Sequence, residues 1–307
     1  MTDTAALIET LAALIVQNYV FPARAAEADR VLRENALAGA YDGDGGEAFC
    51  ARVNVDLFAT CADKHLRLIW HATPLDPTSD EDEESVVTEL REMFRLEGQG
   101  VRRVERLSGN VGLIALTIIP PADLGGAIAG AAMALVAETE ALIFDLRQAR
   151  GGAPDGVALW CSFLFPDGET HLTDVVHGTG GPTRQFWTAA YVPGPRYLDR
   201  PVFALISGET FSGGEAMAYD LQAHGRATLV GETTRGGAHL VEPRQLTPHI
   251  ELRLPVARPL SPVTGANWEA VGVQPDLPVP ADEALETAHR TALNPPEHVA
   301  AMRRSVS

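Results

Sequence analysis

The sequence predicts an α/β protein, with a helical part at the N-terminus and an α/β core after it. Apolar residues recur at helical spacing within residues 4–70, whereas short β-branched runs alternate with helical stretches after about residue 100. The 307 residues suit one large domain or two ordinary ones, and 46% hydrophobic against 21% charged content is typical of a globular protein with a real core.

The first part of the chain contains three helical stretches. They are "TAALIETLAALIVQNYV" (4–20), "AAEADRVLRENALAG" (25–39) and "GEAFCARVNVDLFATC" (46–61). Together they predict a small helical subdomain over residues 1–75. The acidic, Pro- and Ser-containing "DPTSDEDEES" (76–85) is typical of a solvated segment, so residues 76–100 are expected to be an acidic linker region.

The α/β core is expected over residues 101–307. Strands are predicted at 110–119, 141–147, 200–207 and 226–232, with a further strand or hairpin at 249–261. Helices are predicted at 125–140, 214–225 and 282–293. This alternation of strand, helix and strand favours a sheet with at least partly parallel pairing.

Charge and cysteine usage limit the function classes. The net charge of −17 repels phosphate backbones and anionic membranes, so nucleic acid and membrane surfaces are unlikely partners. The three cysteines are odd in number and form no C-x-x-C, which indicates a reducing compartment. No apolar run reaches the ~18 residues of a membrane span, and the first residues, with Asp3 and Glu9, do not resemble a signal peptide. A cytoplasmic protein is expected, and a homo-oligomer is compatible with the sequence.

The stretch "LISGETFSGGEAMAYDL" (205–221) contains the first candidate catalytic residue. Ser212 follows a strand and a short turn and precedes a helix, whose N-terminal amides and dipole favour negative charge. Gly213 and Gly214 would let a substrate approach the backbone. The same residues also fit a capping box, with Ser212 as N-cap and Glu215 at N3. Taken alone, this stretch favours the cap.

Three further segments contain candidates for the same chemistry. Gly151 and Gly152 follow a strand end, where backbone amides could form an oxyanion hole. His65 in "CADKHLRLIW" and His239 in "TTRGGAHLVE" could act as a base, and Glu269 in "NWEAVGVQPDLPV" could orient a histidine. Each of these has an ordinary structural explanation when it is considered alone.

Metal and nucleotide sites are not expected. The sequence has no H-E-x-x-H and no His/Cys spacing suited to zinc. The stretch "GETTRGGAH" lacks the Lys and the Ser or Thr of a phosphate-binding loop. No cofactor is therefore predicted.

Four stretches together resemble the C-terminal processing peptidases, serine peptidase family 41. They are "DKHLRL", "LIFDLRQARGG", "TFSGGEAMAYDLQAHGRATLVGETTRGGA" and "NWEAVGVQPDLPV", and they occur in the family's order. The resemblance covers roughly residues 5–290 and is greatest to the branch with the tricorn core and the interphotoreceptor retinoid-binding protein modules. It implies a ClpP/crotonase-like α/β core with an N-terminal helical subdomain.

The resemblance also implies roles for individual residues. Ser212 falls on the family's nucleophile, and Gly213 with Gly151 or Gly152 falls on its oxyanion-hole donors. His65 matches the place of the histidine base of the tricorn-like branch, although the residue before it is Lys64 here and a serine in the tricorn core. Glu269 matches the acid that completes the set.

Two features separate the chain from the tail-specific proteases of this family. Gly237 stands where their lysine base would stand, and Arg235 cannot replace it because a guanidinium does not deprotonate in proteins. Residues 72–109 are too few to hold a PDZ domain, so substrates would be short peptides or would be delivered by partners.

The sequence therefore predicts a cytoplasmic, PDZ-less serine peptidase with a Ser212, His65 and Glu269 constellation. Two alternatives remain open. One is a binding module that holds an apolar ligand of the retinoid or lipid type, as in the retinoid-binding branch. The other is an esterase or amidase that acts on a small molecule with the same triad.

Overall fold

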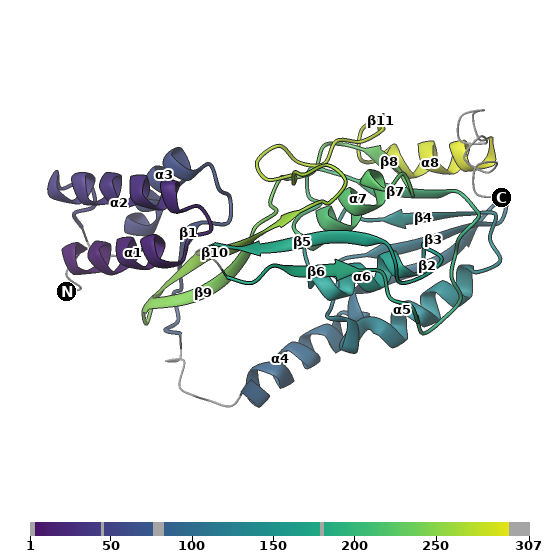
Figure 1. The fold of residues 1–307 in the computed structure, drawn as a ribbon, viewed down its shortest axis with the longest axis horizontal. Helices are drawn as coiled ribbons and strands as arrows, with labels where there is room; N and C mark the ends of the chain where they lie inside the picture. Colours follow the sequence, from purple (N-terminus) through teal and green to yellow (C-terminus); the bar gives the residue numbers. More distant parts are fainter. Residues whose placement is uncertain (1–3, 44–45, 76–82, 179–180, 295–307) are drawn as a thin grey trace. The chain divides into compact units, whose positions relative to one another are not determined.

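Helices and strands follow one another through most of the chain in the computed structural model (Figure 1), which describes residues 4–43, 46–75, 83–178 and 181–294. The residues fall into two compact units. Unit 1 is formed by Met1–Ser85, Val175–Arg184 and His239–Pro259, and unit 2 by Val86–Asp174, Gln185–Ala238 and Leu260–Ser307. The prediction of an α/β fold is confirmed. The predicted limits at residues 75 and 100 stay predictions.

Unit 1 begins with three helices, as the apolar spacing predicts. They are α1 (Thr4–Asn18), α2 (Pro22–Leu37) and α3 (Glu47–Cys61). Helix α2 starts at a proline, whose fixed φ suits the first helical position. Helix α3 ends at Ala62, which adopts the left-handed conformation (φ 51°, ψ 34°) and turns the chain toward the next strand.

The stretch 67–70, which was expected to belong to the helical part, is instead strand β1 (Arg67–Trp70). It pairs antiparallel with β10 (Ile250–Leu260), and β9 (Leu240–Thr247) pairs antiparallel with β10. The pattern R-L-I-W is too short to show a helical period, and its partner lies about 180 residues away in the chain. The sheet order continues from β10 to β5 (His171–His177) and β6 (Arg184–Trp187).

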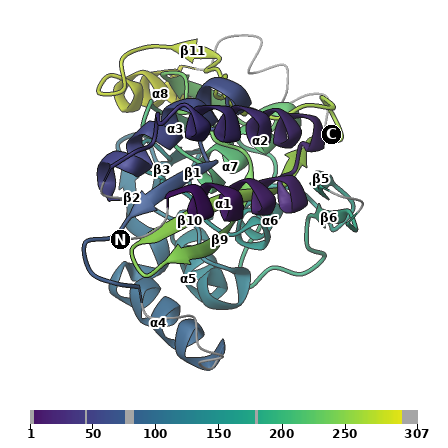
Figure 2. The same ribbon diagram turned by 90° about the vertical axis from the view of Figure 1, so that its left-hand side faces the viewer.

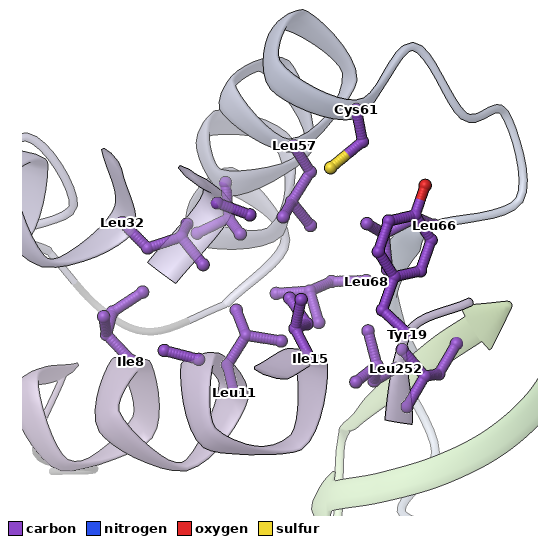
Figure 3. Close-up of a cluster of buried hydrophobic side chains, with 14 of the residues drawn as sticks. Ile8, Leu11, Ile15, Tyr19, Leu32, Leu57, Cys61, Leu66, Leu68 and Leu252 are labelled. Carbon is purple, nitrogen blue, oxygen red and sulfur yellow. The ribbon is translucent and has the colours of Figure 1, made fainter. Parts of the chain in front are cut away.

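One apolar core holds the helices and strands of unit 1 together (Figure 3). Helix α1 contributes Ile8, Leu11 and Ile15, which recur at the spacing of one helix face and are at most 1% exposed. They meet buried side chains from the other elements, namely Leu32, Leu57, Leu68 and Leu252. Figure 2 shows α1 and α2 side by side. The apolar stripe read from the sequence is therefore the core face of α1.

A six-stranded sheet forms the centre of unit 2, in the order β11-β8-β7-β4-β3-β2. All neighbours from β11 to β3 pair in parallel, and β2 is an antiparallel edge strand. The strands are β2 (Val101–Leu107), β3 (Val111–Leu116), β4 (Ala141–Asp145), β7 (Val202–Ile206), β8 (Thr228–Gly231) and β11 (Leu277–Pro278). The predicted partly parallel pairing is confirmed.

Helices cover both faces of this sheet, which explains why its central strands are continuous apolar runs. Buried residues of β3, β4 and β7 that share one face pack against Ala284 and Ala288 of α8 (Ala284–Leu293). On the other face, Phe144 contacts Trp160 edge to face, with ring centroids 5.8 Å apart. The helices here are α5 (Ala122–Val136), α6 (Pro154–Ser162) and α7 (Gly213–Ala223).

Helix α4 (Glu83–Leu96) and the short 3-10 turn η1 (Gly98–Gly100) occupy most of the predicted acidic linker region. Residues 76–82 lie outside the described residues. The acidic run suggested a solvated segment, but apolar residues after it recur at helical spacing, among them Leu90 and Phe94. Within the described parts of the chain, no helix is long and apolar enough to cross a bilayer.

Candidate active site

Ser212 lies at the turn between β7 and α7, two elements of unit 2 that Figure 1 labels. Its backbone has φ 51° and ψ −116°, a region that non-glycine residues rarely occupy and that costs about 1–3 kcal/mol. An ordinary N-cap residue is extended instead. The chain is thus held in a strained conformation at the serine for which the sequence left cap and nucleophile open.

Hydrogen bonds from the preceding turn to the end of β4 hold this strained conformation in place. The Ser207 hydroxyl donates to the Arg147 carbonyl at 2.8 Å, and the Thr210 hydroxyl donates to the Leu146 carbonyl at 2.8 Å. The Phe211 amide donates to the Ala149 carbonyl at 2.9 Å. Parallel pairing of β4 with β7 brings the two strand ends side by side, so the turn before Ser212 lies along the segment before Gly151.

The predicted oxyanion glycines lie against Ser212. A Cβ placed on Gly151 would be 3.7 Å from the Ser212 Cβ and 3.9 Å from its Oγ, and Gly151 itself has φ 150°. A Cβ placed on Gly213 would come within 2.7 Å of the Gly152 nitrogen, so only glycine fits at position 213. Unit 2 therefore brings Ser212, Gly213, Gly151 and Gly152 together.

Glu215 is completely buried and ties the start of α7 to a neighbouring loop. Its Oε2 accepts the amide protons of Ser212 (2.8 Å) and Gly237 (2.9 Å). Its Oε1 accepts from the Thr234 hydroxyl (2.5 Å) and the Gly236 amide (2.6 Å). Burial raises the pKa of this carboxyl above its ordinary value, and the four donors offset part of that rise. Glu215, which the sequence suggested as part of a capping box, therefore binds four donors from two segments of the chain.

Glu269 is attached to the same loop. Its Oε2 accepts the Ala238 amide proton at 2.6 Å, and the neighbouring Trp268 indole donates to the Gly237 carbonyl at 3.2 Å. Trp268 also packs on Tyr219 of α7, with ring centroids 5.2 Å apart. Residues 234–238 therefore connect Ser212 to Glu269 within unit 2, through Glu215 and the loop backbone.

Gly237, which stands where the tail-specific proteases place their lysine, contributes only backbone groups here. Its amide donates to Glu215 and its carbonyl accepts from Trp268. The Arg235 guanidinium lies 5.0 Å from the ring centroid of Phe211, in a cation–π contact.

His65 belongs to unit 1 and is 7% exposed. It lies in the short segment between α3 and β1, where the Asp63 Oδ1 accepts its amide proton at 2.9 Å and that of Leu66 at 3.4 Å. Ser212 and Glu269, in contrast, belong to unit 2.

His239, the other histidine that the sequence singled out as a base, is paired with a carboxylate of unit 1. Its Nδ1 lies 2.7 Å from the Asp63 Oδ2, and the Tyr19 hydroxyl donates to the same oxygen at 3.0 Å. Burial alone would raise the pKa of Asp63. Hydrogen bonds from His239, the His65 amide and Tyr19, with the charge of His239, lower that pKa overall.

Sequence reasoning missed Asp63 and Tyr19. The sequence contains a signal for Asp63, because in an Asx turn an aspartate side chain accepts the amide proton of the residue two positions later. Tyr19 ends an apolar helical run and reads as a core residue. Within either unit alone, the described residues bring no three His, Cys, Asp or Glu side chains together as metal ligands would require.

A cavity of about 510 Å³ lies in unit 2, at the carboxyl ends of β3, β4 and β7. Substrates of open α/β sheets bind at such strand ends. Its wall carries charges of both signs. Lining residues include Arg102, Arg103, Arg147, Asp145, Glu209 and Asp282.

Comparisons with known proteins show the family and the fold of the chain. A model of peptidase family S41 matches residues 110–279, more than half of the chain. The structure resembles a suspected peptidase from Parabacteroides merdae, with a TM-score of 0.69, 17% identity, and 97% of this chain and 99% of that chain covered. It also resembles the photosystem II D1 C-terminal processing protease (TM-score 0.55, 13% identity, 96% and 98% covered). The tricorn protease matches over 98% of this chain and 37% of its own, with a TM-score of 0.56 and 14% identity.

Proposed function

We propose that this chain, which belongs to peptidase family S41, hydrolyses its substrates through an acyl-enzyme on Ser212. The family places it in the general class of serine peptidases, whose substrates are peptides or proteins. In this proposal His65 is the general base and Glu269 orients and stabilises it. The observation that carries the proposal is the strained backbone of Ser212 beside the glycine backbone of residues 151–152.

The first step would be attack of the Ser212 hydroxyl on the scissile carbonyl, with transfer of its proton to His65. The oxygen of the tetrahedral intermediate would accept hydrogen bonds from the Gly213 amide and from Gly151 or Gly152. The N-terminus of α7 adds a positive potential at the same place. His65 would then protonate the leaving amine, and water would hydrolyse the ester.

A histidine base is favoured over a lysine base by the residue at position 237. The glycine there offers no side chain, and its amide is used by Glu215. The tricorn-like, PDZ-less type is therefore part of the proposal. The free cysteines Cys50, Cys61 and Cys161 are buried and are consistent with a reducing, cytoplasmic location, which fractionation of the producing cell would test.

The proposal is tested by labelling with a fluorophosphonate probe at neutral pH. Wild type should label, Ser212→Ala should not, and His65→Ala should label at least ~10²-fold more slowly, as expected for loss of a general base. Ser108→Ala and His177→Ala are matched controls, because Ser108 is exposed and His177 bonds to the nearby Pro182 carbonyl. Failure of wild type to label, or labelling of Ser212→Ala, would refute the nucleophile.

Substrate class separates the peptidase from the esterase or amidase. Cleavage of an unstructured peptide library, abolished by Ser212→Ala, supports the peptidase, whereas turnover of p-nitrophenyl esters without any peptide cleavage supports the small-molecule enzyme. The charged wall of the cavity in unit 2 does not favour the apolar-ligand alternative.

A further inference from the structure

The carboxylate of Asp63, which is buried, fastens the segment that carries His65 to the rest of unit 1. Helix α3 ends at Cys61, Ala62 reverses the chain direction, and β1 begins at Arg67. Between them, the Asp63 Oδ1 accepts the amide protons of His65 and Leu66. The backbone of the proposed base is therefore fixed by the side chain two residues before it.

The other oxygen of Asp63 binds two side chains from distant parts of the chain. Tyr19 follows α1 and donates through its hydroxyl at 3.0 Å, and His239 precedes β9 and places its Nδ1 at 2.7 Å. The exposed fractions of Tyr19, Asp63 and His239 are 0%, 2% and 4%. All three residues, and His65 itself, belong to unit 1.

We propose that Asp63 is the positioning residue of the proposed base His65, and that Tyr19 and His239 hold the Asp63 carboxylate in the orientation this requires. The inference rests on the proposed function, because it gives Asp63 a role only if His65 is the base.

The number and burial of these contacts exceed what a loop of this length needs. A turn of this kind needs one acceptor for its amides, which an exposed Asp or Asn provides. Here the acceptor is a buried carboxylate with four partners, and burying a charge costs free energy that apolar packing would not cost. What such a network provides is a single orientation of the loop, and misplacement of a catalytic group by about 1 Å can cost ~10²-fold in rate.

Aromatic packing further restricts His239. The Phe21 ring meets the His239 ring edge to face at 5.2 Å, and the Arg258 guanidinium lies 5.2 Å from the Phe21 ring centroid. The imidazole thus packs against Phe21, which precedes α2, and Phe21 in turn packs against Arg258 of β10. A change at His239 should therefore reach His65 through Asp63.

The experiment measures the fluorophosphonate labelling rate of Ser212, kcat and KM on a cleaved peptide, and the urea midpoint, for variants of the network. Asp63→Ala should slow labelling by ~10²-fold and lower kcat with KM nearly unchanged. Asp63→Asn keeps an acceptor oxygen for the two amides and should recover most of that loss. His239→Gln, which can still donate to Asp63, should be faster than His239→Leu.

Tyr19→Phe has a matched control in Tyr197→Phe. Both tyrosines are buried and donate one hydroxyl hydrogen bond, Tyr197 to the Thr139 carbonyl at 2.9 Å in unit 2. Tyr19→Phe should slow labelling about fivefold, since a net hydrogen bond is worth about a factor of five, and Tyr197→Phe should leave the rate unchanged. If Asp63→Ala does not fold, this pair and the His239 pair decide the question.

Three outcomes would overturn the inference. They are wild-type labelling by folded Asp63→Ala, an Asp63→Asn variant no faster than Asp63→Ala, and equal slowing by Tyr19→Phe and Tyr197→Phe. If the variants lose only urea stability, Asp63 is a structural residue and the proposed function still stands. If wild type itself does not label, the proposed function fails, and the role of Asp63 fails with it.

Discussion

Glu215→Gln is the sharpest perturbation of the candidate active site, because it preserves the shape of the side chain and changes only its hydrogen bonding. The carboxylate accepts four protons, two on each oxygen. An amide group replaces one acceptor oxygen with an NH₂ donor. The Oε2 side faces two backbone amides, which cannot turn around, so the NH₂ should occupy the Oε1 side, toward Thr234 and Gly236.

The magnitude follows from counting these partners. The Gly236 amide loses its acceptor, which costs about 1–3 kcal/mol, and the bonds that remain change from charge-assisted to neutral, about 1 kcal/mol each. The Thr234 hydroxyl oxygen already accepts the Val273 amide proton at 2.7 Å. If it also accepted a proton from the new NH₂ group, the Thr234 hydroxyl would lose the hydrogen bond that it now donates to Glu215. The burial that raises the pKa of Glu215 makes its carboxylate costly, which offsets part of the loss. The expected net destabilisation is about 2–4 kcal/mol.

Urea unfolding followed by tryptophan fluorescence measures this change, with Trp268 as a reporter bound to the same loop. Glu209→Gln is the matched control, since Glu209 is exposed in the turn before Ser212. The fluorophosphonate labelling rate of the folded Glu215→Gln variant should also fall, because the Ser212 backbone depends on this carboxylate. A variant that unfolds within about 0.5 kcal/mol of the control, the usual range of neutral surface changes, and labels at the wild-type rate would refute the network as the support of Ser212.

Three further predictions concern backbone space and buried acids. Gly213→Ala should abolish labelling and cost about 1–3 kcal/mol, since the new methyl group would meet the backbone of residues 151–152 at 2.7–3.0 Å; Gly208→Ala, with open space around it, should do neither. The lowered pKa of Asp63 means that its contribution to stability is present above the unfolded pKa near 3.8 and is lost as pH falls through the lower folded value. The difference in unfolding free energy between wild type and Asp63→Asn should therefore narrow below about pH 4, and a constant difference across pH 2–7 contradicts this. Burial raises the pKa of the Asp220 carboxyl well above its ordinary value, so its contribution to folding stability is present at acid pH and is lost as pH rises. In thermal melts, the melting temperature of Asp220→Asn relative to wild type should therefore be higher at pH 8 than at pH 4. The same difference at both pH values would contradict the raised pKa.

The sequence was sufficient for most of the helices and parallel strands, because their apolar patterns are local. The stripe Ile8, Leu11 and Ile15 is the core face of α1, and the run that ends at Ile206 is a strand buried on both faces. The edge strand β2 was missed because its residues alternate with charges and are partly exposed. Helix α4 was hidden behind an acidic run that suggested a solvated linker.

The candidate site was readable only in part, for a physical reason. Ser212 and Glu215 are three residues apart at a strand-to-helix turn, so the capping pair could be recognised. The partners that complete the network are backbone amides of residues 236 and 237, which have no sequence signature. Likewise, nothing local links Asp63 to His239, which is 176 residues further along the chain.

Asp63 and Glu215 support the two proposed catalytic residues in the same way, one in each unit. Each is a buried carboxylate that accepts the amide proton of the residue it supports, His65 or Ser212, and each binds donors from a distant segment. An ionised carboxylate accepts hydrogen bonds and donates none, so every partner must present a proton to it and few other loop conformations satisfy the same set. Apolar packing would fix these loops less uniquely, because hydrophobic contact is not directional. The acceptor oxygens of each carboxylate, more than its bulk, should therefore determine how well the serine and the histidine are placed.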